Sequence, residues 1–406
     1  MKTFPTMMLM FVPMALIADL ALGQQPVPRT SAGPSLEGNA ALVYWQAFAA
    51  LPNLSAEQWN RQSKILMDPV AAPLDQQVEA MVQQAQVALE QLRRAAKLDR
   101  VDWALAPQTG LEIQLPHLSK ALRLSDYAVL SARLKFSHGR ASEGVADLIA
   151  ALRLARHVSA DPYFIVLSTG LGIEGNALRT AAAGLKDMDA AAMKDLQAGL
   201  ETLPKGGTMA AVMAESRRRL VGLIKDMEAA DPKDHLTLVE KHFGKLRRTE
   251  LASGSTPTDN APVEKHFRNL LARAKSLLAL SDKFAEAMRI PDEKIDQFEQ
   301  QRVKLTEEVD RHQVHPWPGG LLLCLDSVDR YLEGRVRVLQ PMLQAAIAYR
   351  LGGKEAFEKV RDPYGSGPFE LKTGPGQIEV VSKLRVGPTV IKQSFTVPAT
   401  RRDGAK

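Results

Sequence analysis

The stretch that decides the fold is residues 119–159, SKALRLSDYAVLSARLKFSHGRASEGVADLIAALRLARHVS. Apolar residues recur at helical spacing on both sides of His138-Gly139-Arg140, which predicts helices at 119–137 and 141–159. A glycine just past the first helix lets that helix end in a left-handed residue. The stretch therefore predicts a helical hairpin whose apolar faces meet.

Helical periodicity extends outward from this hairpin in both directions. Leu42, Trp45, Phe48, Ala49 and Leu51 predict one apolar face of a first helix. A capping box, Ser55 with Gln58, predicts the start of the next. Further helices are expected at 74–98, 162–185, 189–203, 208–229, 235–251, 263–288, 291–312 and 321–351, the last kinked at Pro341.

The tail of the chain changes character after the turn-forming residues 362–368, DPYGSGP. Residues 369–371, 377–384 and 389–397 have strand composition. We therefore expect an all-α fold, an irregular bundle or short solenoid of helical hairpins, with a small C-terminal β hairpin or sheet.

The N-terminus has the pattern of a secretion signal. Lys2 precedes an apolar stretch, which ends in Ala21-Leu22-Gly23, a form that signal peptidase recognises. Pro13 and Asp19 interrupt the stretch, which favours cleavage before Gln24 over an uncleaved anchor. The expected location is outside the cytoplasm, periplasmic or extracellular, with no stable membrane span after cleavage.

Composition shifts divide the chain into segments. We expect a signal peptide at 1–23, a flexible tether at 24–36, a helical domain at 37–252 and a linker or loop at 253–262. A second helical segment, 263–352, is expected to pack on the first. A β-containing tail at 353–398 and a disordered end at 399–406 complete the chain.

Charge and cysteine content limit the partners. The formal net charge is +6, and the densest basic runs are Arg217-Arg218-Arg219 and KLRR at 245–248. These runs are either a solvated helix face or a contact for an anionic surface. Export and the lack of interleaved aromatic residues argue against nucleic acid. Cys324, a lone cysteine with apolar flanks, fits a buried packing residue.

Part of the central hairpin follows a known repeat. Gly139 lies at the turn of residues 132–156, Gly144 lies at the small position of the second helix, and Leu148 and Ala151-Leu152 follow at the usual intervals. This stretch resembles one degenerate tetratricopeptide unit. Such units occur in arrays of about three or more. Because one unit is recognisable here, the resemblance implies helix-hairpin packing rather than a peptide-binding superhelix.

Four scattered stretches carry a second resemblance: NAALVYWQAF at 39–48, AALRLAR at 150–156, LETLP at 200–204 and DPYG at 362–365. Together they resemble a group of uncharacterised exported bacterial helical proteins. That resemblance implies export and a helical fold, and it implies no activity.

The tail carries a third resemblance, on Asp362, Pro363, Tyr364, Gly365, Pro368, Phe369, Gly376, Ile378, Val380 and Ser382. These residues look like the C-terminal β element of the major pseudopilins of type II secretion. The prepilin cleavage site and hydrophobic assembly helix of that family are not present in this sequence. The resemblance therefore implies a shared hairpin and not a pilin role.

One stretch has the form of a nucleotide-binding fingerprint. Gly170, Gly172 and Gly175 form G-x-G-x-x-G, after a strand-like segment at 163–167. The fingerprint also needs a following strand that ends in an acid about 20 residues on. Asp187 and Asp189 stand there in helix-start sequence. We therefore expect a helix over 162–185 whose glycines allow a close approach to a neighbour, and no cofactor.

The remaining candidate side chains also have plain structural explanations. His312 and His315 could share a helix face as metal ligands, but no obvious third ligand accompanies them. His117, His138 and His157 are expected to be caps or solvent contacts. Trp45 is expected in the core, and the other tryptophans, Trp59, Trp103 and Trp317, are expected to be partly buried surface anchors. No catalytic, cofactor-binding or metal-ligating residue is assigned.

These features predict an exported, non-catalytic binding or scaffolding protein, with a protein or an envelope polymer as partner. Two alternatives stay open. One is an envelope hydrolase whose site is assembled from scattered helix residues, and the other is a binder of anionic surfaces. A solvent-facing cluster of histidine and carboxylate groups that is conserved in an alignment would favour the hydrolase.

Overall fold

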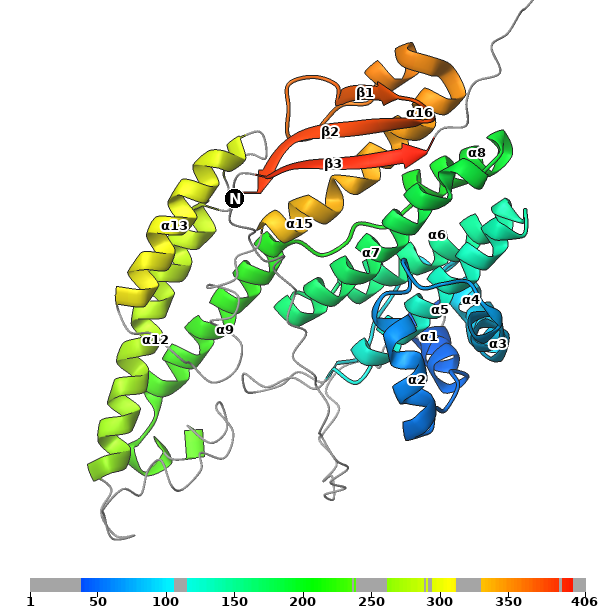
Figure 1. Ribbon diagram of the computed structural model, residues 1–406. Helices are drawn as coiled ribbons and strands as arrows, with labels where there is room; N and C mark the ends of the chain where they lie inside the picture. Colours follow the sequence, from blue (N-terminus) through cyan, green and yellow to red (C-terminus); the bar gives the residue numbers. More distant parts are fainter. Residues whose placement is uncertain are drawn as a thin grey trace, which may run out of the picture. The chain divides into compact units, whose positions relative to one another are not determined.

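Helices account for most of the chain, as the apolar periodicity predicts. The computed structural model describes residues 38–105, 115–235, 237–238, 261–287, 290, 294–311, 330–386 and 389–396. Over these residues the helices are followed by one three-stranded antiparallel sheet (Figure 1). The predicted signal segment 1–23, tether 24–36, linker 253–262 and end 399–406 lie outside the described residues or only touch them at an edge.

The first half of the described chain holds the helices α1 Ala40–Ala49, α2 Ala56–Met67, α3 Gln76–Gln84, α4 Gln86–Ala95, α5 Leu118–Ser137, α6 Ala141–Val158, α7 Phe164–Gly184, α8 Ala190–Glu201 and α9 Met209–Ala229. The second half holds α12 Ala261–Ala287, α13 Ile295–Arg311, α15 Arg330–Arg337, α16 Leu339–Glu358, and the strands β1 Glu370–Gly374, β2 Gln377–Val386 and β3 Thr389–Thr396. Short 3-10 turns lie at Leu185–Asp187 and Pro232–Asp234.

The hairpin that opened the sequence is α5 and α6, within one residue of the predicted limits. Gly139 at the turn has φ +71°, the left-handed value that a side chain disfavours. A Cβ on Gly144 would lie 2.6 Å from the ring of Phe136, and one on Gly184 would lie 2.5 Å from the same ring. Glycine on α6 and α7 therefore lets both helices close around one aromatic side chain of α5.

Helices α5, α6 and α7 form the centre of the packing, because each contacts the other two. On one side α4 packs on α1, α5 and α6, and α3 packs on α5. On the other side α8 packs on α6, and α16 packs on α7 and α8. Leu124, Leu130, Leu148 and Leu154 are among the leucines of α5 and α6 with no exposed surface.

Ion pairs on the surface accompany the packing of α9 on α12 and of α12 on α13. Arg217 of α9 pairs with Asp282 of α12. Lys275 pairs with Glu228 at 2.6 Å. Such exposed pairs contribute about 0–1 kcal/mol each, so the apolar contacts beneath them account for most of the association.

The sheet has the order β1-β2-β3, and both strand pairs are antiparallel. A tight turn at Pro375-Gly376 joins β1 to β2, and Gly376 has the left-handed φ of +69°. The buried face includes Ile378, Val380, Leu384 and Phe395. This face meets α16, α15 and α7, since β2 packs on α15 and α16 and β3 packs on α7 and α16.

Two expectations for the first helices are wrong. The predicted helix 74–98 is divided into α3 and α4 at Ala85, whose ψ of 3° departs from the helical value. The bend lets α3 pack on α5 while α4 packs on α1 and α6. The buried face of α1 consists of Ala40, Ala41, Tyr44, Ala47 and Phe48, whereas Leu42 is 40% exposed. Alanines carry little weight in an apolar pattern, yet they let α1 approach α4 closely.

The long helix expected at 321–351 also differs. Its first residues lie outside the described part of the chain, and the rest is α15 and α16, interrupted at Val338. Pro341 has no N–H for the carbonyl of Arg337, which accounts for an interruption one turn before the proline. Helix α16 also continues beyond residue 351, past an interruption at Gly353 with φ +71° and ψ −160°.

Two smaller shifts concern helix starts. Helix α7 begins at Phe164 with Tyr163 as its N-cap residue, so Pro162 stands just outside the helix and not in its first turn. Helix α12 begins at Ala261, two residues before the predicted start. Of the helix expected at 235–251, nearly all lies outside the described residues.

Candidate functional site

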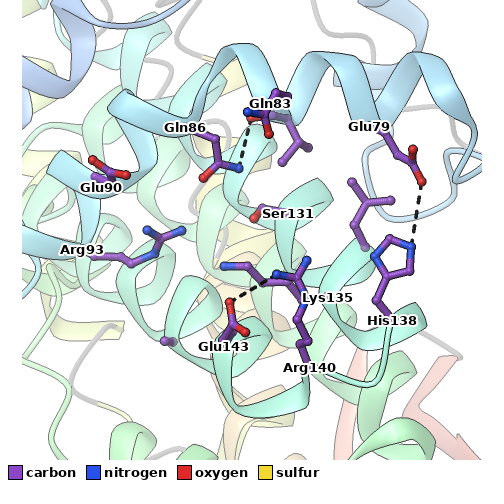
Figure 2. A pocket seen from close by; sticks show the side chains of 13 residues that line it. Glu79, Gln83, Gln86, Glu90, Arg93, Ser131, Lys135, His138, Arg140 and Glu143 are labelled. Atoms are coloured by element: carbon purple, nitrogen blue, oxygen red, sulfur yellow. Dashed lines mark hydrogen bonds and ion pairs between the residues drawn. The ribbon is translucent and has the colours of Figure 1, made fainter.

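A cavity of about 800 Å³ opens between α3, α4, α5 and α6 (Figure 2). This volume lies within the range of small-molecule sites, about 300–1,000 Å³. Its lining is unusual for such a site, because most of the side chains are charged or carry amides. The cavity therefore suits a polar ligand.

One wall of the cavity is a stripe of polar residues on α3 and α4. Glu79, Gln83, Gln86 and Glu90 follow one another at intervals of three or four residues, which places them on one helical face. The stripe continues across the bend at Ala85. Apolar residues of the same helices, Val78, Met81, Leu89 and Leu92 among them, face the core instead.

The opposite wall comes from α5, the hairpin turn and the first turns of α6. Lys135 and His138 come from the end of α5, and Arg140 and Glu143 follow across the turn. Figure 2 shows Lys135 and Arg140 reaching toward the same central space as Arg93, which enters from α4. One wall thus offers carboxylates and amides, and the other offers mainly cations.

A buried carboxylate holds two of these cations in place. Asp147 of α6 is 1% exposed, and its Oδ1 accepts a hydrogen bond from Arg93 Nε at 2.6 Å. Its Oδ2 accepts from Lys135 Nζ at 2.6 Å and from Ser131 Oγ at 2.7 Å. Three elements, α4, α5 and α6, meet at this carboxylate. We call Arg93, Ser131, Lys135 and Asp147 the Asp147 cluster.

The Asp147 cluster combines groups that elsewhere serve as nucleophile and base. A serine nucleophile needs a neighbouring base to take its proton. Here Ser131 donates to the carboxylate, and the ammonium of Lys135 is held in an ion pair by the same oxygen. A lysine base must first lose that proton. The geometry therefore fits the positioning of two cations better than covalent catalysis.

Two further ion pairs at the cavity are weak. Glu79 lies 3.9 Å from His138, and Arg140 lies 3.5 Å from Glu143. All four side chains are about half exposed, so solvent screens both pairs. A ligand can displace these contacts at little cost.

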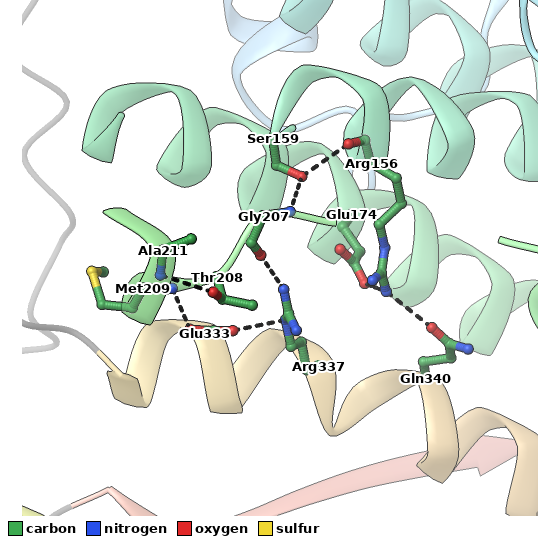
Figure 3. A network of polar contacts seen from close by, with 10 residues as sticks. All are labelled: Arg156, Ser159, Glu174, Gly207, Thr208, Met209, Ala211, Glu333, Arg337 and Gln340. Carbon is green, nitrogen blue, oxygen red and sulfur yellow. Dashed lines mark hydrogen bonds and ion pairs between the residues drawn. The ribbon is translucent and has the colours of Figure 1, made fainter. Parts of the chain in front are cut away.

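A second polar cluster joins α15 and α16 to α6, α7 and the segment before α9 (Figure 3). Arg156 of α6 pairs with Glu174 of α7 and also donates to Gln340 of α16 at 3.1 Å. Glu333 of α15 accepts from the backbone N–H of Met209 at 2.8 Å. Burial raises the pKa of Glu174 above its ordinary value, and Arg156 opposes that shift. This cluster fastens packed elements together, and none of its residues lines the cavity of Figure 2.

The three histidines near the hairpin are not alike. His138 ends α5 and is half exposed, as expected for a cap or solvent contact. His117 and His157 are 0% and 2% exposed, so the expectation is wrong for both. Burial lowers the pKa of each to about 4, with the charge of Arg153 adding to the effect at His157.

These two histidines belong to an aromatic cluster beneath α1. The ring of His117 stacks on Trp103 with centroids 4.5 Å apart. Trp103 Nε1 donates to the backbone oxygen of His157 at 3.0 Å. Trp103 is 6% exposed, whereas Trp45 is only partly buried, so the expectation that Trp45 is core and Trp103 a surface anchor is wrong for both. A buried tryptophan needs a hydrogen-bond partner for its indole N–H, and the backbone oxygen of His157 provides one.

The glycine fingerprint lies inside a helix. Gly170, Gly172 and Gly175 all belong to α7, and residues 163–167 form no strand. A Cβ on Gly170 would lie 2.7 Å from the backbone oxygen of Ala155 on α6. The predicted close approach of a neighbouring helix is confirmed at this position. The strand-turn-helix context of a dinucleotide site is not present at these residues.

Several candidates fall elsewhere. His312, His315, Trp317 and Cys324 lie outside the described residues. Within the described ranges, no three His, Cys, Asp or Glu side chains come together so as to hold a metal ion. None of the described helices combines the length and apolar composition needed to cross a membrane.

The three arginines of the first basic run are paired with two carboxylates. Arg218 and Arg219 pair with Glu215 at 2.6 and 2.9 Å, and Arg217 pairs with Asp282. Hydrogen bonds from Arg218 and Arg219 lower the pKa of Glu215. The run at 245–248 lies outside the described residues.

The residues of the Asp147 cluster were not singled out from the sequence. Ser131 and Lys135 are one turn apart in a helix of mainly apolar residues, and Asp147 stands between Val145 and Leu148 on α6. Polar residues at such positions are a signal for buried pairing. The sequence does not say which cation reaches which carboxylate.

Comparisons of this chain with protein-family models, with curated proteins and with solved structures found no match. The class of protein is therefore described by its own structure: a mostly helical protein with a small three-stranded antiparallel sheet and a polar cavity between α3, α4, α5 and α6.

Proposed function

We propose that this chain is an exported, non-catalytic binding protein whose ligand site is the polar cavity between α3, α4, α5 and α6. The Asp147 cluster carries the proposal. It holds Arg93 and Lys135 at the cavity before any ligand is present. A site whose side chains are ordered in advance loses less conformational entropy on binding.

The alternatives have less support. A hydrolase with a scattered site needs an activated nucleophile, and the serine at this cavity shares its acceptor with an ion-paired lysine. A binder of anionic surfaces needs accessible cations. All three arginines of the run 217–219 have carboxylate partners within the protein. His138 and Glu79 are a solvent-facing histidine and carboxylate at the cavity, but their 3.9 Å separation is too long for the hydrogen bond that a catalytic pair needs.

The test compares the native protein with a variant whose cavity is obstructed. Ala146 lines the cavity and is exposed, so the indole of Ala146→Trp occupies part of the space without entering the core. Ala191→Trp, at an exposed position of α8 that does not line the cavity, is the matched control. Thermal unfolding is measured with a panel of amino acids, dicarboxylates, polyamines, monosaccharides and inorganic phosphate.

We expect at least one compound of the panel to raise the Tm of the native protein and of Ala191→Trp, and to leave Ala146→Trp unchanged. A ligand at a hundredfold excess over its Kd stabilises the folded state by about 2.7 kcal/mol, which such a measurement detects. The proposal fails if every compound affects the native protein and Ala146→Trp equally.

Export is the second part of the proposal and rests on the pattern of residues 1–23. Expression in a bacterial host should yield an envelope-fraction protein whose mass corresponds to a start at Gln24. Gly23→Arg, which places a large residue at the cleavage position, should leave the precursor uncut. A full-length native protein confined to the cytoplasm would refute this part.

A further inference from the structure

The cavity separates charges of opposite sign. Glu79 and Glu90 stand on the α3–α4 wall, with two glutamines between them. Lys135 and Arg140 stand on the opposite side, and Arg93 reaches the cavity from the last turn of α4. Glu143 is the one carboxylate of the lining that lies on the cationic side, and it pairs with Arg140.

The balance of charge disfavours ligands that carry one sign alone. The lining holds three carboxylates and three cations that are charged at neutral pH, in addition to His138. An anion that contacts Arg93 and Lys135 meets Glu90 nearby, and a polyamine on the acidic wall meets the cations. Like charges brought together in a partly enclosed site repel each other, so the lining itself disfavours a ligand with charges of one sign.

A cation and a carboxylate at the same end of the cavity, Arg93 and Glu90, both have hydrogen-bonding atoms available for a ligand. Arg93 engages Asp147 through Nε, and the described residues offer its Nη1 and Nη2 no acceptor. Those two nitrogens have the planar arrangement that suits a carboxylate. Glu90 is exposed to the cavity, and no cation of the described residues forms an ion pair with it.

Glu90 and Arg93 are three residues apart on α4, so their Cβ atoms are neighbours, about 5–6 Å apart by helix geometry. Figure 2 shows both side chains at one end of the cavity, with Glu79 and His138 at the other. A ligand that bridges Glu90 and Arg93 needs a positive and a negative group separated by only a few bonds.

We propose that the cavity binds a small zwitterion of the amino-acid class. Its carboxylate docks on the terminal nitrogens of Arg93 and on Lys135, and its ammonium docks on Glu90. The glutamines of the same wall, Gln83 and Gln86, accept and donate hydrogen bonds to the rest of the molecule. This proposal rests on the proposed function, which places the ligand site at this cavity.

The experiment is isothermal titration of the full-length mature protein with each of the twenty amino acids. Every amino acid that binds is compared with its N-acetyl derivative, which lacks the ammonium, and with its primary amide, which lacks the carboxylate. We expect at least one free amino acid to bind with a Kd below 1 mM, a weak affinity that corresponds to about −4.1 kcal/mol. Each capped form should bind at least tenfold more weakly.

Two variants assign the contacts. Glu90→Gln should weaken the free amino acid at least tenfold and leave the N-acetyl form nearly unchanged. Arg93→Lys keeps a cation beside Asp147 but loses the planar fork, so it should weaken the free amino acid more than the amide. Glu228→Gln, in an exposed pair between α9 and α12, is the matched control and should bind like the native protein.

Other results overturn the proposal in distinguishable ways. Binding of succinate, inorganic phosphate or putrescine in the cavity, without binding of any amino acid, refutes the zwitterion and leaves the cavity as a ligand site. Equal binding of free and capped amino acids would likewise refute the zwitterion and leave the cavity as a ligand site. Failure of every probe to distinguish the native protein from Ala146→Trp refutes the proposed function as well.

Discussion

The phenolic oxygen of Tyr44 and Nδ1 of His157 lie 2.9 Å apart in the core and join α1 to α6 across 113 positions of the sequence. Both groups are almost fully buried, and burial raises the pKa of Tyr44 well above its usual range. The neutral imidazole is the form that fits this site. Protonation of His157, or of His117, which stacks on Trp103, would place a positive charge among aromatic rings.

Acid should therefore destabilise the protein. A histidine has a pKa near 6.5 when unfolded, and burial lowers it to about 4 for His117 and His157. The unfolded chain thus binds more protons between these values. The stability that these residues provide is complete above pH 6.5 and is lost as the pH falls toward 4. Each histidine contributes a slope of up to about 1.4 kcal/mol per pH unit.

Urea unfolding at a series of pH values between 7.5 and 4 measures this slope. His117→Phe keeps a ring against Trp103 without a titrating group, and neither nitrogen of His117 has a hydrogen-bond partner to lose among the described residues. We expect this variant to have a shallower pH dependence in that window. His138→Gln, at a half-exposed position, should retain the native slope. Identical slopes for His117→Phe and the native protein would contradict the assignment.

Removal of the Asp147 carboxylate should be costly. Asp147→Asn leaves Lys135, which is 10% exposed in its side chain, without its counter-charge. Loss of one partner from a buried ion pair destabilises by about 3–5 kcal/mol. Because Arg93 is 29% exposed and regains some solvent, we expect about 2–4 kcal/mol here. Chemical denaturation measures the change.

Glu143→Gln provides the comparison for Asp147→Asn in the same cavity. Its pair with Arg140 is half exposed, so the expected loss is within about 1 kcal/mol. Equal effects of the two substitutions would show that the Asp147 cluster does not hold the cavity together.

The sequence predicts features that depend on neighbouring residues better than contacts between residues far apart in the chain. Local signals were sufficient for the α5–α6 hairpin and for the capping box, where Ser55 Oγ accepts from Gln58 N at 3.2 Å. The buried face of α1 was not predicted, because alanines bury it. The partners of Asp147 were not predicted either, since Arg93 is 54 residues away and reaches it only through the placement of α4.

The turn that precedes the sheet depends on another buried carboxylate, that of Asp362. Asp362 is 2% exposed and accepts hydrogen bonds from Tyr364 N at 3.0 Å, Ser382 Oγ at 2.9 Å and Lys383 N at 2.6 Å. Asp362→Asn turns one acceptor oxygen into a donor that faces another donor. The expected loss is about 1–3 kcal/mol.

The effect of Asp362→Asn should be local. Hydrogen exchange should quicken in β2, where Lys383 lies, and stay unchanged in α5 and α6. Asp282→Asn, at an exposed position of α12, serves as control and should change neither region. Uniform loss of protection across the chain would instead mean that the sheet and the helices unfold as one unit.

The glycines of the G-x-G-x-x-G stretch should respond oppositely to alanine. At Gly170 a Cβ would lie 2.7 Å from the Ala155 oxygen and 2.7 Å from Ser159 Cβ, so α6 and α7 would have to separate. We expect Gly170→Ala to destabilise by about 1–3 kcal/mol, as for other overpacked sites. At Gly172 nothing lies within 4 Å of the added carbon. There the higher helix propensity of alanine should stabilise by up to about 1 kcal/mol.

The two substitutions distinguish between two explanations of the glycine spacing, helix packing and a phosphate-binding turn. In a dinucleotide fingerprint each glycine serves the turn or the approach to pyrophosphate, so alanine at either position disturbs the site. Of these two positions in α7, only Gly170, which faces α6, is restricted. Urea midpoints of Gly170→Ala and Gly172→Ala that shift in opposite directions would establish that the spacing of these glycines reflects helix packing. A loss of stability in both would reopen the question of what the second glycine contacts.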